Sequence, residues 1–261
     1  MLYCSAYLLI MDDIQDKSVQ RRGGPTVHVA LAGKHSKHYG VAQALNAEML
    51  ANHRAMIVLL SLPVADSVKL RAVELLSKDI SVTIAGQIND IHNQVADEVT
   101  PELIINTMIW KTAHYTFVSP MELGACLAGR QRLGKRLHNY AIQAGIAFQI
   151  TDDVLGVFGV TEESGKSVND DIREGKRTLL VAYAQTHVSS DEWQVMKKIL
   201  GNSRATKAEC DRLRHYFEIS GARDYCIQQA AMYADKSEGF LKKNSEDFYR
   251  QVVRFSVERT M

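Results

Sequence analysis

LLIMDDIQDKSVQRRGGP, residues 8–25, joins an apolar segment to a cluster of acids and then to paired arginines. On an α-helix, Asp12 and Asp16 are four residues apart and share one face, while Asp13 lies about 100° round the helix. Like charges at the end of a buried helix repel one another and need cations. Mg²⁺ is held by one or two carboxylates together with substrate phosphates, so the spacing favours a magnesium site. The alternative interpretation is a solvated acidic turn.

The paired arginines follow the acids after four spacer residues. Arginine suits bidentate recognition of phosphate, so Arg21 and Arg22 are candidate phosphate ligands. Gly23-Gly24-Pro25 predicts a turn directly after them. We expect this turn to aim both guanidinium groups back toward the acids.

A second acidic pair, Asp152-Asp153, ends another apolar segment about 140 residues later. Gln149 is three residues before Asp152 and shares its helix face. Lys166 and Lys176 follow in a polar loop punctuated by glycine, which taken alone would be an ordinary solvated loop. Together the two clusters predict two walls of one cavity, for a ligand with a polyanionic end and an apolar tail.

The rest of the chain has helical periodicity. Apolar residues recur at three- and four-residue steps over 30–62, and Asp66 is the expected N-cap of a second helix reaching about residue 95. Thr100-Pro101-Glu102 predicts a helix start, with Pro120 as the interruption. Further helices are expected over 136–157, 191–200, 207–220 and 222–244. Strand signals are nearly absent, so we expect one all-α domain over residues 1–261 with functional loops at 15–26 and 159–177.

Composition excludes several other classes. Hydrophobic residues make up 46% and charged residues 23% of the 261, and the formal net charge of +1 argues against a general nucleic-acid binder. The apolar start, residues 1–11, is too short to span a bilayer and lacks a basic leader. The four cysteines have no zinc-site spacing, which favours reduced thiols. We therefore expect a cytoplasmic protein with no nucleic-acid partner and no stable membrane insertion.

As a set, these motifs resemble those of the trans-type isoprenyl diphosphate synthases, the polyprenyl synthetases. The matching segments are Asp12-Asp13-x-x-Asp16-x4-Arg21-Arg22-Gly23, Gly86-Gln87-x-x-Asp90, Lys111-Thr112, Phe148-Gln149-x-x-Asp152-Asp153 and Gly165-Lys166…Gly175-Lys176-x-Thr178. The resemblance covers the chain to about residue 184. It implies an all-α, isoprenoid synthase-type helical bundle around a central cavity, usually a homodimer.

The resemblance also implies the chemistry. A Mg²⁺-dependent prenyltransferase would condense isopentenyl diphosphate with an allylic diphosphate in a 1′-4 head-to-tail reaction. Three Mg²⁺ ions are expected, with ligands Asp12, Asp13, Asp16 and Asp152. The implied catalytic residues are Asp12, Asp13, Lys111, Gln149 and Asp152. The implied substrate-binding residues are Arg21, Lys111, Thr112, Gln149, Lys166 and Lys176, with Arg22 contacting isopentenyl diphosphate.

Product length is implied by two residues before the first acidic pair. In the family, the fourth and fifth residues before that pair shape the floor of the tail tunnel, and here they are Leu8 and Tyr7. A single bulky aromatic at this place resembles geranylgeranyl diphosphate (C20) synthases. The alternative is that Tyr7 is an ordinary core residue.

The sequence departs from the family pattern at three places. Gly156 stands where the second cluster would have a third acid, and Ala47-Glu48 stands where the family often has Gly-Asp on a central helix, which we interpret as a packing variation. No Gly-Lys-x-x-Arg motif precedes Asp12. The domain is therefore expected to be N-terminally incomplete, and an inactive or partner-dependent subunit or fragment remains an alternative function. A terpene cyclase is a further alternative: Asn89-Asp90 begins the metal motif of that class, but Asn93 stands where serine or threonine is needed.

Overall fold

The structure is a computed structural model that describes residues 2–159, 168–242 and 247–258. This part of the chain is almost entirely helical, which confirms the all-α prediction. Its elements, in chain order, are α1 (Leu2–Gln15), β1 (Gln20–Arg21), β2 (Gly24–Pro25), α2 (Val27–Ala32), α3 (Lys37–Leu60), α4 (Asp66–Val95), α5 (Pro101–Met108), η1 (Ile109–Val118), α6 (Ser119–Leu127), α7 (Gln131–Phe158), α9 (Asp170–Glu174), α10 (Leu179–His187), α11 (Ser190–Ile199), α12 (Lys207–Ile219), α13 (Ala222–Gly239) and α14 (Asp247–Glu258).

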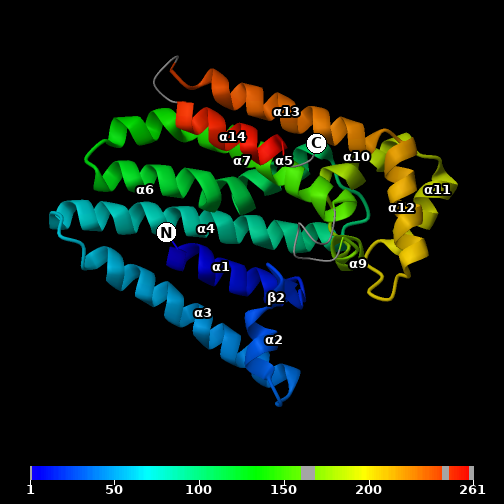
Figure 1. Cartoon of the computed structure of the whole chain (residues 1–261), viewed down its shortest axis with the longest axis horizontal. Helices are drawn as coiled ribbons and strands as arrows, with labels where there is room; N and C mark the ends of the chain where they lie inside the picture. Colours follow the sequence, from blue (N-terminus) through cyan, green and yellow to red (C-terminus); the bar gives the residue numbers. More distant parts are fainter. Residues whose placement is uncertain (1, 160–167, 243–246, 259–261) are drawn as a thin grey trace.

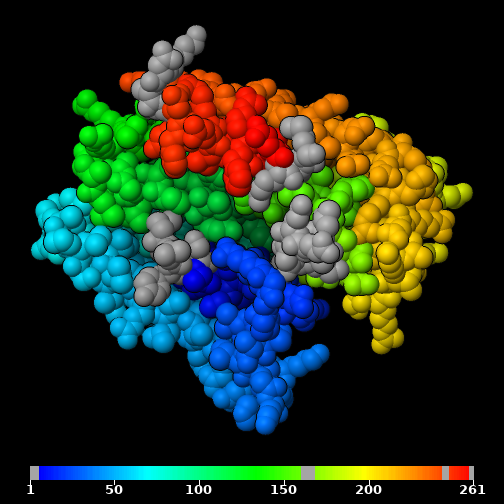
Figure 2. Space-filling model, viewed as in Figure 1, coloured from blue at the N-terminus to red at the C-terminus, as the bar shows by residue number. Residues whose placement is uncertain are grey.

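The long helices form a bundle with η1 at its centre. η1 packs between α4 and α7, α13 lies along α7, and α1 packs on α3 (Figure 1). The space-filling view shows the N-terminal helices, in blue, on one side and α13 and α14, in orange and red, on the other (Figure 2). Residues far apart in the sequence, on α1, η1 and α7, are thereby brought to the middle of the molecule.

Two apolar cores hold this arrangement. The larger one is built around α7, with fully buried residues such as Ile150 and Leu180. The smaller one packs Tyr7 of α1 against Leu76 of α4 and Leu123 of α6. Burial of such side chains stabilises a fold by about 1.5–3 kcal/mol each, so the second core fixes α1 in the bundle.

Two expected helix boundaries are wrong. The helix expected over 30–62 is divided into α2 and α3, because Gly33 adopts a positive φ of 51° and Ser36 then caps α3 by accepting a hydrogen bond from the Tyr39 N–H. Asp66 is the first residue of α4 and not its N-cap; Ala65 holds that position without a side-chain hydrogen bond. Thr100, in contrast, caps α5 as expected by accepting from the Leu103 N–H.

Pro120 does not interrupt the helix that begins at Pro101. The chain continues through η1, a π-helix, where the Ser119 N–H bonds to the His114 carbonyl five residues back. Pro120 then stands in the first turn of α6, a position that tolerates proline because the first turn has free N–H groups.

Both expected loops contain short regular elements. The first loop, residues 15–26, contains a short hairpin in which β1 pairs with β2 through a two-residue turn. The turn residues Arg22 and Gly23 have φ of 53° and 75°, as in a type I′ turn. In the second loop, residues 160–167 lie outside the described residues, and α9 ends at Gly175 with a left-handed φ of 78°. No helix in the described ranges is long and apolar enough to cross a membrane.

Candidate active site

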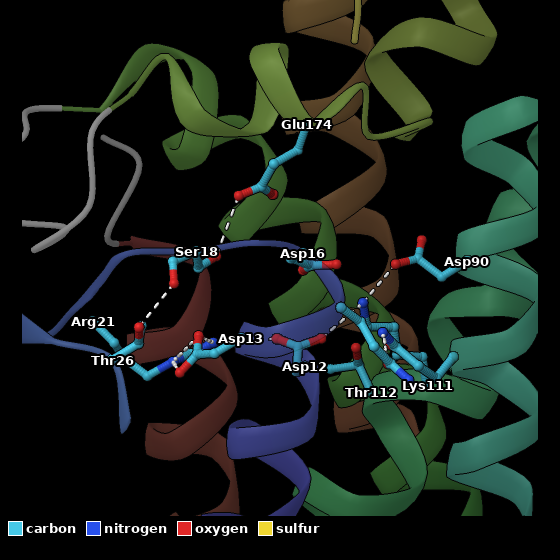
Figure 3. A network of polar contacts seen from close by, with 12 residues as sticks. Asp12, Asp13, Asp16, Ser18, Arg21, Thr26, Asp90, Lys111, Thr112 and Glu174 are labelled. Carbon is cyan, nitrogen blue, oxygen red and sulfur yellow. Dashed lines mark hydrogen bonds and ion pairs between the residues drawn. The ribbon is translucent and has the colours of Figure 1, made fainter. Parts of the chain in front are cut away.

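The hairpin after α1 turns Arg21 back onto the first acidic cluster, as expected. Arg21 Nε donates to both carboxylate oxygens of Asp13, at 2.8 and 3.0 Å, and Nη2 donates to Asp12 Oδ2 at 3.2 Å (Figure 3). Thr26 fixes the returning strand by donating to the Ser18 carbonyl at 2.9 Å. The positive charge of Arg21 therefore lies beside two acids that would otherwise repel each other.

Lys111, from η1, joins α1 to α4. Its Nζ lies 3.2 Å from Asp12 Oδ1 and 2.5 Å from Asp90 Oδ2 (Figure 3). Burial opposes the charge of Lys111, but Asp12, Asp90 and Asp16 outweigh burial and raise its pKa above the ordinary value. Lys111 is therefore a fixed cation and not a proton acceptor.

The acid Asp12 is stabilised by the same contacts. Its burial works to raise its pKa, but the positive charges of Lys111, Lys176 and Arg21 outweigh burial and lower the pKa to about 2. Asp12 is therefore ionised throughout the physiological pH range, ready to compensate a cation.

Asp16 has the opposite environment. It is 5% exposed, and neither carboxylate oxygen has a hydrogen-bond partner among the described residues. Burial, and next the negative charge of Asp12, raise the pKa of Asp16. Lys176 is one of the cations that act on Asp16: its Nζ lies 3.9 Å from Asp16 Oδ2 and 3.2 Å from Asp171 Oδ1. Lys176 thus connects the first acidic cluster to the second loop.

The second wall is a chain of hydrogen bonds between η1 and α7. Thr112 Oγ1 donates to Gln149 Oε1 at 2.7 Å, and Gln149 Nε2 donates to Asp153 Oδ1, also at 2.7 Å. Asp153 is 8% exposed, and burial raises its pKa to about 8 although the charge of Lys176 opposes this. The amide of Gln149 is therefore held in one orientation by a donor on one side and an acceptor on the other.

A cleft lies beside the second wall. Its polar wall includes Lys111, Thr112, Gln149 and Lys176, and Met108 contributes an apolar part. The cleft is thus lined by residues from α4, α5, η1, α7 and the segment after α9.

The structure brings most of the predicted site residues together, and leaves a few elsewhere. Asp152 is exposed at the end of α7 and does not line the cleft, whereas its neighbour Asp153 does. Arg22 is exposed in the turn, Lys166 lies outside the described residues, and Tyr7 belongs to the smaller core, where Leu8 packs against it. The assignments of these residues stay predictions.

Four polar residues of the site were not among the predicted site residues. Asp90 and Asp153 belong to motifs given in the sequence analysis, so their positions in those motifs could have identified them as site residues. Tyr115 is half-buried; its partial burial, and to a lesser degree the charge of Asp12, raise the pKa of its phenol. Asp171 contacts Lys176, and nothing in its spacing pointed to that contact.

The donor set fits a hard divalent cation that is shared with phosphate. Within the described residues, no three His, Cys, Asp or Glu side chains are already grouped to hold a metal. Ammonium and guanidinium groups lie among the carboxylates instead, and the buried Asp16 oxygens have no hydrogen-bond partner. Mg²⁺ takes oxygen ligands and completes its shell with water and substrate phosphates, so it needs only one or two of these carboxylates.

Comparison with known proteins gives the family. The family model for polyprenyl synthetase matches residues 3–217. The chain belongs to the polyprenyl synthetase family. It is accordingly a prenyltransferase, and all the motif residues quoted above lie within the matched range.

Individual relatives agree in fold and in class. The chain is 34% identical over 236 residues, 87% of this chain and 67% of the relative, to a geranylgeranyl diphosphate synthase of Sulfolobus acidocaldarius. It is 29% identical over 261 residues, 97% of this chain and 79% of the relative, to a geranylfarnesyl diphosphate synthase of Aeropyrum pernix. A crystal structure of geranylgeranyl pyrophosphate synthase from Corynebacterium glutamicum, complexed with isoprenyl diphosphate and magnesium, superposes with a TM-score of 0.91 at 30% identity, covering 98% of this chain and 76% of that one.

Proposed function

We propose that this prenyltransferase condenses isopentenyl diphosphate with an allylic diphosphate, 1′-4 and head to tail, to give geranylgeranyl diphosphate. One observation carries the proposal: Lys111 and Lys176, two half-buried cations from distant parts of the chain, meet the carboxylates of Asp12 and Asp16. A diphosphate bridged to carboxylates by metal ions needs this pairing of acids with cations. Most of the hydrocarbon would then lie in the apolar interior.

The first chemical step is the ionisation of the allylic C–O bond, whose electron pair leaves with the diphosphate. Lys111, Lys176 and Arg21 would stabilise that negative charge, and because they are fixed before reaction they need no reorganisation. When bound, Mg²⁺ would add Lewis-acid stabilisation of the same leaving group, and we propose three ions held by Asp12, Asp13, Asp16 and Asp152.

The second step forms the new C–C bond. The double bond of isopentenyl diphosphate attacks the allylic cation, and loss of one proton restores a double bond in the product. We propose the departing diphosphate as the proton acceptor, because Lys111 and Lys176 hold their own protons. Gln149 would face the reacting carbons in the orientation that Thr112 and Asp153 impose.

The apolar tail would run along α1 toward Leu8 and Tyr7. Tyr7 is 2% exposed and fully packed, so it would close the channel and limit the product to C20. Two of the relatives named above are a geranylgeranyl (C20) and a geranylfarnesyl (C25) diphosphate synthase, so product length varies among the relatives.

A homodimer is the proposed working form. α3 exposes Met49, Leu50 and Ile57, which are 58%, 60% and 55% exposed, and α4 exposes Ile88 at 62%. Exposed apolar rows on two neighbouring helices are typical of an interface between protein chains.

The test is a direct assay with labelled isopentenyl diphosphate, farnesyl diphosphate and Mg²⁺, with the product identified by mass. We expect a C20 diphosphate, and we expect Lys111→Met to lower the turnover by about 100-fold or more, as removal of one stabilising donor does in other enzymes. Lys78→Met is the matched control, because Lys78 lies on the surface of α4 and pairs only with Glu74 among the described acids.

Two results would contradict the proposal in different ways. Turnover that is equal in Lys111→Met and the parent would remove Lys111 from the chemistry. A parent chain that binds diphosphate with Mg²⁺ but never turns over would favour the partner-dependent subunit instead.

A further inference from the structure

Gly156 occupies the position of the missing third acid in the second cluster. The first cluster reads Asp-Asp-x-x-Asp from residue 12 to 16, and the second reads Asp-Asp-x-x-Gly from 152 to 156. The space beside Gly156 is not empty. A Cβ atom built on Gly156 would overlap the carboxylate of Asp171, chiefly its Oδ2. Glycine at 156 therefore leaves room for a carboxylate that comes from another element.

Asp171 reaches this place from α9 and faces Lys176, the cation that connects the first cluster to the second loop. Its Oδ1 lies 3.2 Å from Lys176 Nζ, and the same ammonium lies 3.9 Å from Asp16 Oδ2. The Asp171 side chain is only 13% exposed. A carboxylate of the second loop and one of the first acidic cluster therefore share a single positive charge.

The ammonium groups of Lys111 and Lys176 both act on Asp16, but neither of them makes a hydrogen bond with it. Asp16 is 95% buried, and neither of its oxygens has a hydrogen-bond partner in the described part of the chain. A buried carboxylate without hydrogen bonds or a close cation is costly, and a distance of 3.9 Å to Lys176 is long for a charge-assisted hydrogen bond. A further cation close to Asp16 would supply the compensation that hydrogen bonds do not.

We propose that Asp171 supplies the carboxylate that residue 156 lacks, and that with Asp16 it holds a divalent cation at the diphosphate end of the site. This inference rests on the proposed function, because the cation would be shared with the substrate diphosphate. The third carboxylate of the second cluster would then come from α9, and not from residue 156 on α7 as in the Asp-Asp-x-x-Asp motif.

The test is the Mg²⁺-dependent binding of inorganic diphosphate, measured by titration calorimetry over a range of Mg²⁺ concentrations. Asp171→Asn keeps the size of the side chain and removes its charge. We expect it to weaken the Mg²⁺-dependent affinity by about 10- to 100-fold, the loss seen when groups around a metal are changed. Asp191→Asn, which removes an exposed carboxylate at the start of α11, should leave the affinity unchanged.

A measurement in EDTA separates this role from a purely positional one. If Asp171 only positioned Lys176, Asp171→Asn would weaken diphosphate binding equally with and without Mg²⁺. We expect the weak binding in EDTA to be unchanged, and an equal loss in both conditions would overturn the inference.

A second experiment exchanges the residues at positions 156 and 171. Gly156→Asp alone should crowd Asp171 and weaken Mg²⁺-dependent binding, whereas Gly156→Asp with Asp171→Gly returns one carboxylate to the same space and should recover much of the affinity. A folded double variant with no recovery would contradict the equivalence of the two positions.

A parent chain without any Mg²⁺-dependent diphosphate binding would contradict the proposed function itself, while normal binding by Asp171→Asn would overturn this inference alone.

Discussion

Asp153 is a carboxylic acid in a buried site, and burial raises its pKa to about 8 from an ordinary value of 3.8. Between those pH values the folded chain retains a proton that the unfolded chain releases. The contribution of Asp153 to the free energy of unfolding is therefore greatest below about pH 4, and it falls as the pH rises toward 8.

We expect Asp153→Asn to remove this pH dependence. The variant should gain most stability relative to the parent at pH 8, gain less at pH 5 and show little difference near pH 4, measured by urea unfolding without Mg²⁺. Asn still accepts the hydrogen bond from Gln149 through its Oδ1. Asp152→Asn, at the exposed neighbouring position, is the control, and identical pH profiles for the two variants would contradict the burial argument.

Tyr7 is the residue on which the proposed product length depends. Tyr7→Ala removes a ring packed against Leu76 and Leu123, and should leave a cavity at the end of the tail channel. We expect products longer than those of the parent, together with a loss of roughly 3–5 kcal/mol in stability, as for other buried aromatic residues.

The measurement is mass analysis of the products from a catalytically active form of the protein. Tyr7→Phe keeps the ring and should keep the product length. Unchanged product lengths in folded Tyr7→Ala would show that Tyr7 is an ordinary core residue.

At the scale of the elements, η1 decides where Lys111 and Thr112 lie. Its backbone approaches α4 so closely that a Cβ atom on Gly86 would overlap the main chain at Trp110 and Lys111. Lys111 can reach Asp90 on α4 because glycine permits this approach.

Gly86→Ala should therefore separate α4 from η1. Because the overlapped atoms are backbone, we expect a loss of at least about 1–3 kcal/mol in stability and a marked loss of activity. Gly124→Ala is the matched control, since a Cβ atom there meets nothing within 4 Å and should stabilise α6 by roughly 0.5–1 kcal/mol. Equal melting temperatures for the two variants would contradict the close-approach argument.

The same elements show how far sequence patterns reach. Thr100 and Pro101 predicted the start of α5, because capping is local chemistry. The π-helix η1 was not predicted, since its register depends on packing between α4 and α7. The Asp152 and Asp153 pattern located the second wall, yet which of the two acids turns inward depends on how α7 packs in the bundle.

At the scale of the whole molecule, the patterns predicted that two acidic clusters share one site, and Lys176 connects the first cluster to the loop that follows the second. Spacing along the chain carried no information on Asp171, because it reaches the site across the space beside Gly156. Contacts between elements that are distant in sequence are set by tertiary packing, which a single sequence does not encode in any local pattern.

The apolar rows on α3 and α4 lead to a prediction about assembly. A stable interface buries about 1,600 Å² in total and has an apolar centre, and a charge placed at that centre is expensive to desolvate. Ile57→Glu on α3 and Ile88→Glu on α4 should each shift the protein from dimer to monomer in sedimentation velocity experiments. Phe255→Glu is the control, because Phe255 on α14 is 70% exposed and lies on the opposite side of the bundle. A parent chain that sediments as a monomer at micromolar concentration, or a dimer that survives both substitutions, would contradict the proposed interface.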